Sequence, residues 1–384
     1  MYLARKLYPV LLLPLLLFYA CSKKTIREEL LTGIQQQDAP YSFSQLKKYG
    51  DTIVGINVGS IKDYLEQKKL NVTDFLGDSL WPNSTGYSKI YTTDEVTVIP
   101  DNESFIYPGS LLKGNSVSTS SYVPVPIRNY KRYPIKVSVS FPSDLAVGTI
   151  DTPSLSRTRV FLRKALLAPG FSTSPMEEFL YESFNFWYYD EIKWAYGSNV
   201  NVKGLFSSSS ISTDVSVVRT QFPTAFVARF TMRNFSMELE EPANGKLVDE
   251  NNVDLGVLYG YSPVYVNKVT YGRMGIIVIE SNDMSYQLKT IYEKIVRKLF
   301  KRSNETISEY EKTLVNTSKI NIYLIGGSSN VQGQAVTGYD GFVNYIAHSG
   351  EFSASDPGVP ILFKMRYLSD NSPVKTTFKV NFPR

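Results

Sequence analysis

Alternating apolar and polar residues predict several β-strands along the chain. Residues 135–141 alternate with a clean period of two, and residues 52–58 and 95–99 carry strand-forming side chains in similar runs. A turn at residues 151–153 precedes a segment, 157–167, for which the pattern predicts a helix. The pattern therefore indicates a mixed chain in which strands dominate.

Two more strands are predicted on either side of a serine run at residues 207–210. Apolar and polar side chains alternate before and after this run, with Leu205 as an exception on the polar side. The apolar positions are Val200, Val202, Phe206, Ile211, Val215 and Val217. A half-buried hairpin of a soluble protein has this pattern, and so does a membrane-spanning hairpin, which needs about 9–11 residues per strand. The alternation alone leaves both structures open.

Residues 288–302 have apolar side chains at helical spacing and predict an amphipathic helix. The apolar positions are Leu288, Ile291, Tyr292, Ile295, Leu299 and Phe300. The polar face holds six positive charges and one negative charge. As a strand, the segment alternates poorly, because Lys294 and Lys298 would share the face of Val296. A solvated helix that packs on a sheet is the simplest interpretation.

Half of the eighteen residues from 179 to 196 are aromatic. Such a cluster fits a packed β-core, strands that later face lipid headgroups, or a platform that binds a glycan. Composition alone favours core packing, so we expect these side chains to be buried.

The composition excludes most kinds of active site. The 384 residues include one His and one Cys, which excludes a zinc site built on those ligands, a disulfide framework and a Cys–His nucleophile pair. His348 has no nucleophile-elbow motif near it. We therefore expect a non-enzyme without metal or cofactor, in a globular chain of about two to three domains.

The N-terminal residues resemble an export signal. Arg5 and Lys6 precede an apolar run too short to cross a bilayer as a helix, and Ala20 stands directly before Cys21. This arrangement predicts a bacterial lipoprotein signal at residues 1–20 with lipidation of Cys21, anchored at the outer membrane or the periplasmic face, or released. An ordinary secretory signal with a chance cysteine is the alternative. Removing the signal lowers the net charge from +5 to +3, because it takes away two positive charges and no negative ones. This charge is too weak to suggest nucleic-acid binding.

Several motifs occur in the same order as in a known family. They are residues 262–273, which end in Tyr271-Gly272-Arg273; residues 106–112, Ile-Tyr-Pro-Gly-Ser-Leu-Leu; residues 322–327, which end in two glycines; and Pro-Gly-Val-Pro-Ile at 357–361, followed by Leu-Ser-Asp-Asn at 368–371. In this order the chain resembles the cholesterol-dependent cytolysins, or thiol-activated cytolysins, from about residue 41 to its end.

The resemblance implies an α+β fold, elongated, with a central twisted antiparallel β-sheet flanked by helical clusters. After a tether at residues 21–40, it implies three domains. They are a linker-type β domain (41–92 and 365–384), a scaffold domain (93–178, 235–275 and 345–364) and a pore-forming domain (179–234 and 276–344).

The resemblance also implies roles for the segments above. Helical clusters near residues 191–218 and 281–310 would refold into transmembrane hairpins, and Gly326 and Gly327 would let an edge strand leave its neighbour and open the sheet to the next subunit. The implied lipid-facing positions are Val200, Val202, Phe206, Ile211, Val215, Val217, Leu288, Tyr292, Val296 and Phe300. The poor alternation of the second segment weighs against its hairpin, because a lysine that faces lipid at the membrane midplane costs about 2–4 kcal/mol.

The sequence ends at Arg384, about where the family begins its C-terminal membrane-recognition domain. The Trp-rich undecapeptide and the Thr-Leu pair that bind cholesterol in the family are therefore not among these residues. We expect a pore-forming toxin subunit similar to the short component of two-component systems, which some bacteria use against other bacteria. It would form a ring with itself or with a long component, make a β-barrel pore in a lipid bilayer, and require an activating protease.

Candidate cleavage sites are Lys301-Arg302 and the tether. Two other functions remain open from the sequence. One is a surface lipoprotein that binds a glycan through the 179–196 aromatics, and the other is an immunity-like lipoprotein that caps a cytolysin-like partner.

Overall fold

The structure is a computed structural model. It describes residues 42–50, 52–57, 74–99, 102–117, 122–126, 131–172, 178–196, 219–242, 246–249, 255–284, 287–300, 303–326, 334–347 and 352–383. The predicted lipidation site Cys21, the tether, the hairpin positions from Val200 to Val217, the candidate cleavage site Lys301-Arg302, Gly327 and His348 lie outside these ranges.

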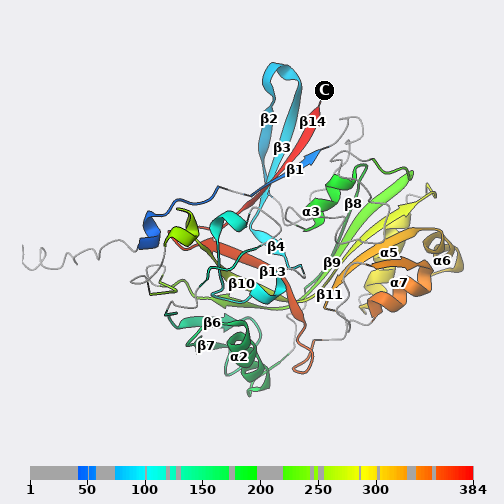
Figure 1. Ribbon diagram of the computed structural model, residues 1–384. Helices are drawn as coiled ribbons and strands as arrows, with labels where there is room; N and C mark the ends of the chain where they lie inside the picture. Colours follow the sequence, from blue (N-terminus) through cyan, green and yellow to red (C-terminus); the bar gives the residue numbers. More distant parts are fainter. Residues whose placement is uncertain are drawn as a thin grey trace, which may run out of the picture.

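A small four-stranded sheet joins the two ends of the described chain. Its order is β1-β14-β3-β2, with β1 parallel to β14 and the other pairs antiparallel. The strands are β1 (Thr52–Asn57), β2 (Asp74–Leu80), β3 (Gly86–Thr93) and β14 (Thr376–Pro383). The sheet projects from the main body, and the C-terminus lies at its far end (Figure 1).

The larger sheet has ten strands within the described residues, and its main path runs β12-β11-β10-β9-β6-β7. Its strands are β4 (Glu95–Thr97), β5 (Leu111–Leu112), β6 (Ile135–Val139), β7 (Val147–Ile150), β8 (Glu178–Asn185), β9 (Thr224–Leu239), β10 (Val264–Ser281), β11 (Lys319–Ile325), β12 (Gln334–Thr337) and β13 (Val359–Tyr367). Every pair in this sheet is antiparallel. The two longest strands, β9 and β10, lie side by side and form its centre.

Helices cover parts of this sheet. The α-helices are α2 (Leu155–Leu167), α3 (Lys193–Tyr196), α5 (Leu288–Leu299), α6 (Glu309–Asn316) and α7 (Gly338–Ala347). Short 3-10 turns are η1 (Ser42–Gln45), η3 (Pro82–Ser84), η4 (Glu103–Phe105), η5 (Gly114–Ser116), η6 (Tyr189–Ile192) and η9 (Leu255–Leu258). Among the described residues, none of these helices has the length and apolar character that crossing a bilayer requires.

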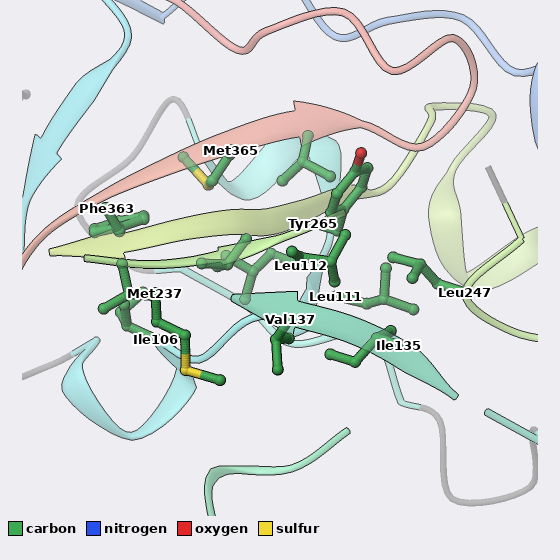
Figure 2. Packing of buried hydrophobic residues seen from close by; sticks show 14 of the residues in the cluster. Ile106, Leu111, Leu112, Ile135, Val137, Met237, Leu247, Tyr265, Phe363 and Met365 are labelled. Atoms are coloured by element: carbon green, nitrogen blue, oxygen red, sulfur yellow. The ribbon is translucent and has the colours of Figure 1, made fainter. Parts of the chain in front are cut away.

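Three buried clusters hold the molecule together. The first, shown in part in Figure 2, packs β6, the first half of β10 and β13 against one another through side chains such as Val137, Tyr265 and Phe363. The second and third clusters lie on opposite faces of the second half of β10 and of its neighbours. The protein is therefore α+β with a central antiparallel sheet, as the sequence predicts.

The predicted elements are present with small shifts at their ends. Strands occur at 52–57, 95–97 and 135–139, and helices at 155–167 and 288–299. The first of these helices begins where Ser154 accepts a hydrogen bond from the backbone N–H of Arg157, which satisfies an otherwise free donor of the first turn.

Candidate functional site

The candidate site is the point at which β10 changes its neighbour along one edge. The first half of β10 pairs with β13 as far as Gly272, and the second half pairs with β11 from Met274 onward. β9 pairs along the other edge from Lys268 to Ser281. The register shifts on both edges of β10 within residues 270–272. Because a bulge bends a strand, these shifts mark residues 270–272 as the place where the sheet changes direction.

Three glycines meet at this junction. A Cβ on Gly272 would lie 1.9 Å from the backbone oxygen of Met232, so only glycine fits there. Gly326, at the end of β11, has φ +86°, and Gly358, just before β13, has φ +85°. Both lie against Gly272, because a Cβ on either would come within 2.8 Å of the Gly272 oxygen. Side chains at these positions would separate three chain segments that now touch.

Arg273 is buried directly beside the glycines. The side chain is 1% exposed, and its Nη2 lies 2.6 Å from Oδ2 of Asp356. Its Nε and Nη1 have no hydrogen-bond partner among the described residues. A buried cation needs a counter-charge, so this pair holds β10 to the segment that leads into β13.

Asn234 adds a second link at the same place. It is the residue of β9 that the register shift leaves unpaired opposite β10. Its side-chain nitrogen donates a 3.0 Å hydrogen bond to the carbonyl of Pro357. The bulge in β9 is therefore held against the segment that contains Gly358.

β11 is shielded along its outer edge by a short strand. β12 pairs with β11 only from Lys319 to Ile322, which leaves the last three residues of β11 without a β12 partner. α7 follows β12 directly and buries Phe342 and Ile346 in the third cluster. In the described part of the chain, four residue pairs and one helix thus separate this strand edge from its surroundings.

Layers of helix and turn cover both faces of the sheet here. On one face α5 packs its apolar side on alternate residues of β9 and β10, such as Phe226 and Ile277. On the other face, side chains from η6 and α3, including Ile192 and Trp194, pack on the intervening residues, such as Ile276. In Figure 1, α5, α6 and α7 gather beside β11, away from α3. Both faces of the long strands are therefore apolar. An antiparallel sheet with one face in solvent would instead alternate apolar and polar residues along each strand.

The aromatic stretch predicted to be core is largely buried. Phe184, Phe186, Tyr188, Trp194 and Tyr196 are each between 0% and 6% exposed. Their rings pack on one another and on the small sheet, as in the stacked pair of Trp194 and Phe378 with ring centroids 6.1 Å apart. In this arrangement these five rings have no free face for a sugar.

The predicted membrane positions of the second segment lie on α5. Leu288, Tyr292 and Val296 are fully buried against the sheet. Phe300, which caps the helix, lies 5.1 Å from the ring of Phe230. The prediction of a helix here is confirmed. Its refolding into a transmembrane hairpin stays a prediction.

A salt bridge fastens α5 to α6. Nζ of Lys294 lies 2.8 Å from Oε1 of Glu311, and Glu311 also forms a capping box with Ser308. Burial alone would raise the pKa of Glu311, but hydrogen bonds from Lys294 and Ser308 hold it below its ordinary value of 4.5. The pair therefore consists of two charged partners at neutral pH.

A buried carboxylate on β10 was not predicted from the sequence. Glu280 is 1% exposed and accepts hydrogen bonds from the hydroxyl of Tyr189 and, at 2.9 Å, from that of Thr220. Burial, and then the bond to Glu280, raises the pKa of Tyr189 above its ordinary value of 10.0, so the hydroxyl keeps its proton. Nζ of Lys319 lies 3.8 Å from Glu280. These bonds fasten the η6 layer to the ends of β10 and β11.

A second ion pair fastens the same layer to β9 and β8, on the same face of the sheet. Arg229 of β9 is 4% exposed and lies 2.9 Å from Glu182 of β8. It also donates to the carbonyl of Ala195 in α3 at 3.4 Å. No sequence motif signals this pair, because its two members lie 47 residues apart.

Comparisons with known proteins assign the family. The model of the thiol-activated cytolysins matches residues 88–381, most of the chain. The chain belongs to the thiol-activated cytolysin family. Among its relatives, pneumolysin of Streptococcus pneumoniae is 23% identical over 302 residues, which cover 75% of this chain and 61% of pneumolysin. Listeriolysin O of Listeria monocytogenes is 23% identical over 90% of this chain and 69% of its own. The matched region thus spans less than two thirds of pneumolysin.

Solved structures of the same family share the fold. A crystal structure of wild-type pneumolysin aligns with a TM-score of 0.60 over 95% of this chain and 74% of its own, at 18% identity. A non-hemolytic pneumolysin from Streptococcus pneumoniae strain ST306 aligns with a TM-score of 0.63 at 17% identity, over 89% of this chain and 73% of its own. The human-specific toxin intermedilysin aligns with a TM-score of 0.60 at 20% identity, over 89% and 72%.

Proposed function

We propose that this chain is a pore-forming subunit that assembles through the outer edge of β11. Support comes from the family and from the short cover of this edge: among the described residues, β12 pairs with β11 from Lys319 to Ile322. An open strand edge pairs readily with another strand, so a short removable cover is a means of controlling assembly. In the assembled state, β11 of one subunit would pair with β8 of the next, since β8 forms the opposite edge of this part of the sheet.

The glycine junction would allow the edge to open. For β12 and α7 to leave, the chain after β11 must turn away at Gly326, whose positive φ already departs from strand geometry. Gly327 would assist in the same way. Loss of the cover exposes Phe342 and Ile346, which are both fully buried in the closed state. Burying each of these side chains contributes roughly 1.5–3 kcal/mol, which keeps the edge closed until a partner arrives.

The membrane-spanning part of the proposal uses the layers on the two faces of the sheet. Residues near 191–218, with Val200, Val202, Phe206, Ile211, Val215 and Val217 toward lipid, would form one hairpin. α5 and its neighbours would form the second, with Leu288, Tyr292, Val296 and Phe300 toward lipid. In that register Lys294 and Lys298 also face lipid, at about 2–4 kcal/mol each at the midplane but about 0–1 kcal/mol near a headgroup interface. The second hairpin therefore requires these lysines near an interface.

The finer features of the proposal rest on the family resemblance and, for the lipid anchor, on the N-terminal signal. The chain would act as the short component beside a long cytolysin-like component that selects the target bilayer. Proteolysis, at Lys301-Arg302 or in the 21–40 tether, would permit assembly, and lipidated Cys21 would hold the protein at the membrane of its exporting cell. A glycan-binding role is not proposed, because five of the nine aromatic side chains that would carry it are buried and the other four are partly buried.

A disulfide across the cover tests the opening step. Asn321 and Ala335 are direct partners in the antiparallel β11–β12 pair. Directly opposite Cα atoms lie about 4.5–5.5 Å apart, within the range that a disulfide spans. The Asn321→Cys/Ala335→Cys variant, made in the form that starts at residue 22, should release no dye from liposomes when oxidised. Dithiothreitol should restore release. The long cytolysin-like component and the protease are present in every measurement.

A matched lock in the small sheet controls for the disulfide itself. Ile90 and Lys379 are direct partners in β3 and β14, which stay together in the proposal. Oxidised Ile90→Cys/Lys379→Cys should release dye like the parent protein. Undiminished release by the oxidised β11–β12 lock would contradict opening at this edge.

A further inference from the structure

A cavity of about 250 Å³ lies between α2 and the start of β13, and Gly358 of the glycine junction is part of its lining. One wall is a single face of α2, and the opposite wall is the segment from Pro357 to Pro360. The ring of Tyr271 on β10 forms the floor, and Ala354 closes one side. With Glu103 of η4, four segments of the chain therefore meet around one hollow: η4, α2, β10 and residues 354–360.

The lining is mostly apolar. On α2, Leu162 and Leu166 are 7% and 4% exposed, and they lie one helical turn apart toward the hollow. Tyr271 is 6% exposed, and Val359 and Pro360 complete the apolar surface. Since one water takes about 30 Å³ of liquid volume, the cavity holds roughly eight waters, or an organic group of on the order of ten heavy atoms.

The mouth of the cavity is positively charged. Arg159 and Arg163 are exposed, lie one turn apart on α2 and both line the cavity. Neither has a carboxylate within ion-pair distance among the described residues. Glu103 is the acidic residue that also lines the cavity, so the mouth carries a net charge of about one positive unit.

Arg159 also acts on the floor of the cavity. Burial raises the pKa of the Tyr271 hydroxyl above its ordinary value of 10.0, and the positive charge of Arg159 opposes this shift. The guanidinium group is therefore close enough to influence a buried polar atom of the cavity. An anion at the mouth would meet both arginines, whose planar groups bind carboxylates through paired hydrogen bonds.

We propose that this cavity binds a small amphipathic monoanion, with an acyl or aryl tail among the leucines, Tyr271 and Pro360 and a carboxylate between Arg159 and Arg163. The apolar walls suit the tail, and the unpaired arginines suit the anionic head. Glu103 disfavours a second negative charge on the ligand. The buried apolar lining, in which Leu162, Leu166 and Tyr271 are 4–7% exposed, favours a free molecule whose tail enters the cavity over a lipid whose tails stay in a bilayer.

Calorimetric titration of the full chain with octanoate tests the proposal. We expect one saturable site, at least tenfold weaker binding of butanoate because its tail is shorter, and no saturable binding of octylammonium. Equal affinity for octylammonium, or no saturable binding of octanoate, would overturn the proposal.

Variants of the two halves of the site sharpen the test. Arg159→Gln/Arg163→Gln, which changes two exposed side chains, should weaken octanoate at least tenfold, and Ala354→Leu should do the same by filling the cavity. Lys164→Gln, on the same helix but outside the lining, should bind like the parent. Unchanged affinity in either test variant would contradict the site.

Vesicles distinguish a free anion from a membrane source. Sedimentation with phosphatidylglycerol vesicles should be equal for the parent and for Arg159→Gln/Arg163→Gln. Loss of sedimentation in this variant would overturn the assignment to a free molecule and place a lipid headgroup at the arginines.

Discussion

The ion pair at the strand junction yields a quantitative prediction. Asp356→Asn keeps the shape of the side chain but leaves the Arg273 guanidinium, which is 1% exposed, without its counter-charge. Breaking a fully buried pair costs about 3–5 kcal/mol, whereas exposed pairs contribute about 0.2–1 kcal/mol. The Asp356 side chain is 52% exposed, so solvent screens its charge in part. We therefore expect a loss of about 1–2 kcal/mol of unfolding free energy.

A second pair on the same strand provides the control. Lys268 of β10 lies 3.4 Å from Glu238, and the two acids are similarly exposed, at 49% for Glu238 and 52% for Asp356. The cations differ, since Lys268 is 32% exposed. Glu238→Gln should therefore cost less than about 1 kcal/mol. The comparison isolates the effect of burying the cation.

Urea unfolding followed by tryptophan fluorescence measures both variants. The midpoint should fall clearly for Asp356→Asn and little for Glu238→Gln. In a background with Arg273→Met, which removes the cation, Asp356→Asn should lose most of its effect, because the two side chains act as a coupled pair. Equal midpoints for the two single variants, or an undiminished effect in the Arg273→Met background, would refute the proposed role of the buried cation.

Gly326→Ala should lower the unfolding free energy by at least about 1–2 kcal/mol, because φ +86° is unfavourable for a side chain and the Cβ would lie 2.8 Å from the Gly272 oxygen. Gly341→Ala, in α7 with open space around the new Cβ, should instead raise the unfolding free energy by about 1 kcal/mol. Urea midpoints measure both variants, and a loss at Gly341 that matches the loss at Gly326 would contradict the argument. The Glu311–Lys294 pair should stabilise the protein relative to Glu311→Gln above the ordinary pKa of 4.5. Because the folded-state pKa is lowered, this advantage should vanish as the pH falls through the folded-state value, and a difference in midpoint that persists at about pH 2 would count against it.

The sequence predicts well those elements whose signal is local. α5 is evident because apolar side chains recur at helical spacing, and burial of Leu288, Tyr292 and Val296 follows from that spacing. β6 is evident from its strict alternation. Five of the nine aromatic side chains in the dense stretch are buried in the core, as composition favours. In each case the residues that determine the structure lie within a few turns or one strand length of one another.

The site itself depends on contacts that no local pattern contains. Arg273 and Asp356 are 83 residues apart, and Ser353 to Gly358 has no periodicity that would place it against β10. The sequence singles out Gly326 at a strand end, but not its contact with Gly272. β12, with four residues, is too short for a pattern to detect. Glu280 lies within an apolar strand, where a single carboxylate gives no indication of its partners.

Pore formation is the central claim, and one experiment tests it most directly. The form that starts at residue 22 would be mixed with dye-loaded liposomes, with and without the long cytolysin-like component, before and after limited proteolysis. We predict large SDS-resistant rings and dye release only when both components are present and cut. A protein that stays monomeric and releases no dye under all four conditions would contradict the proposed function.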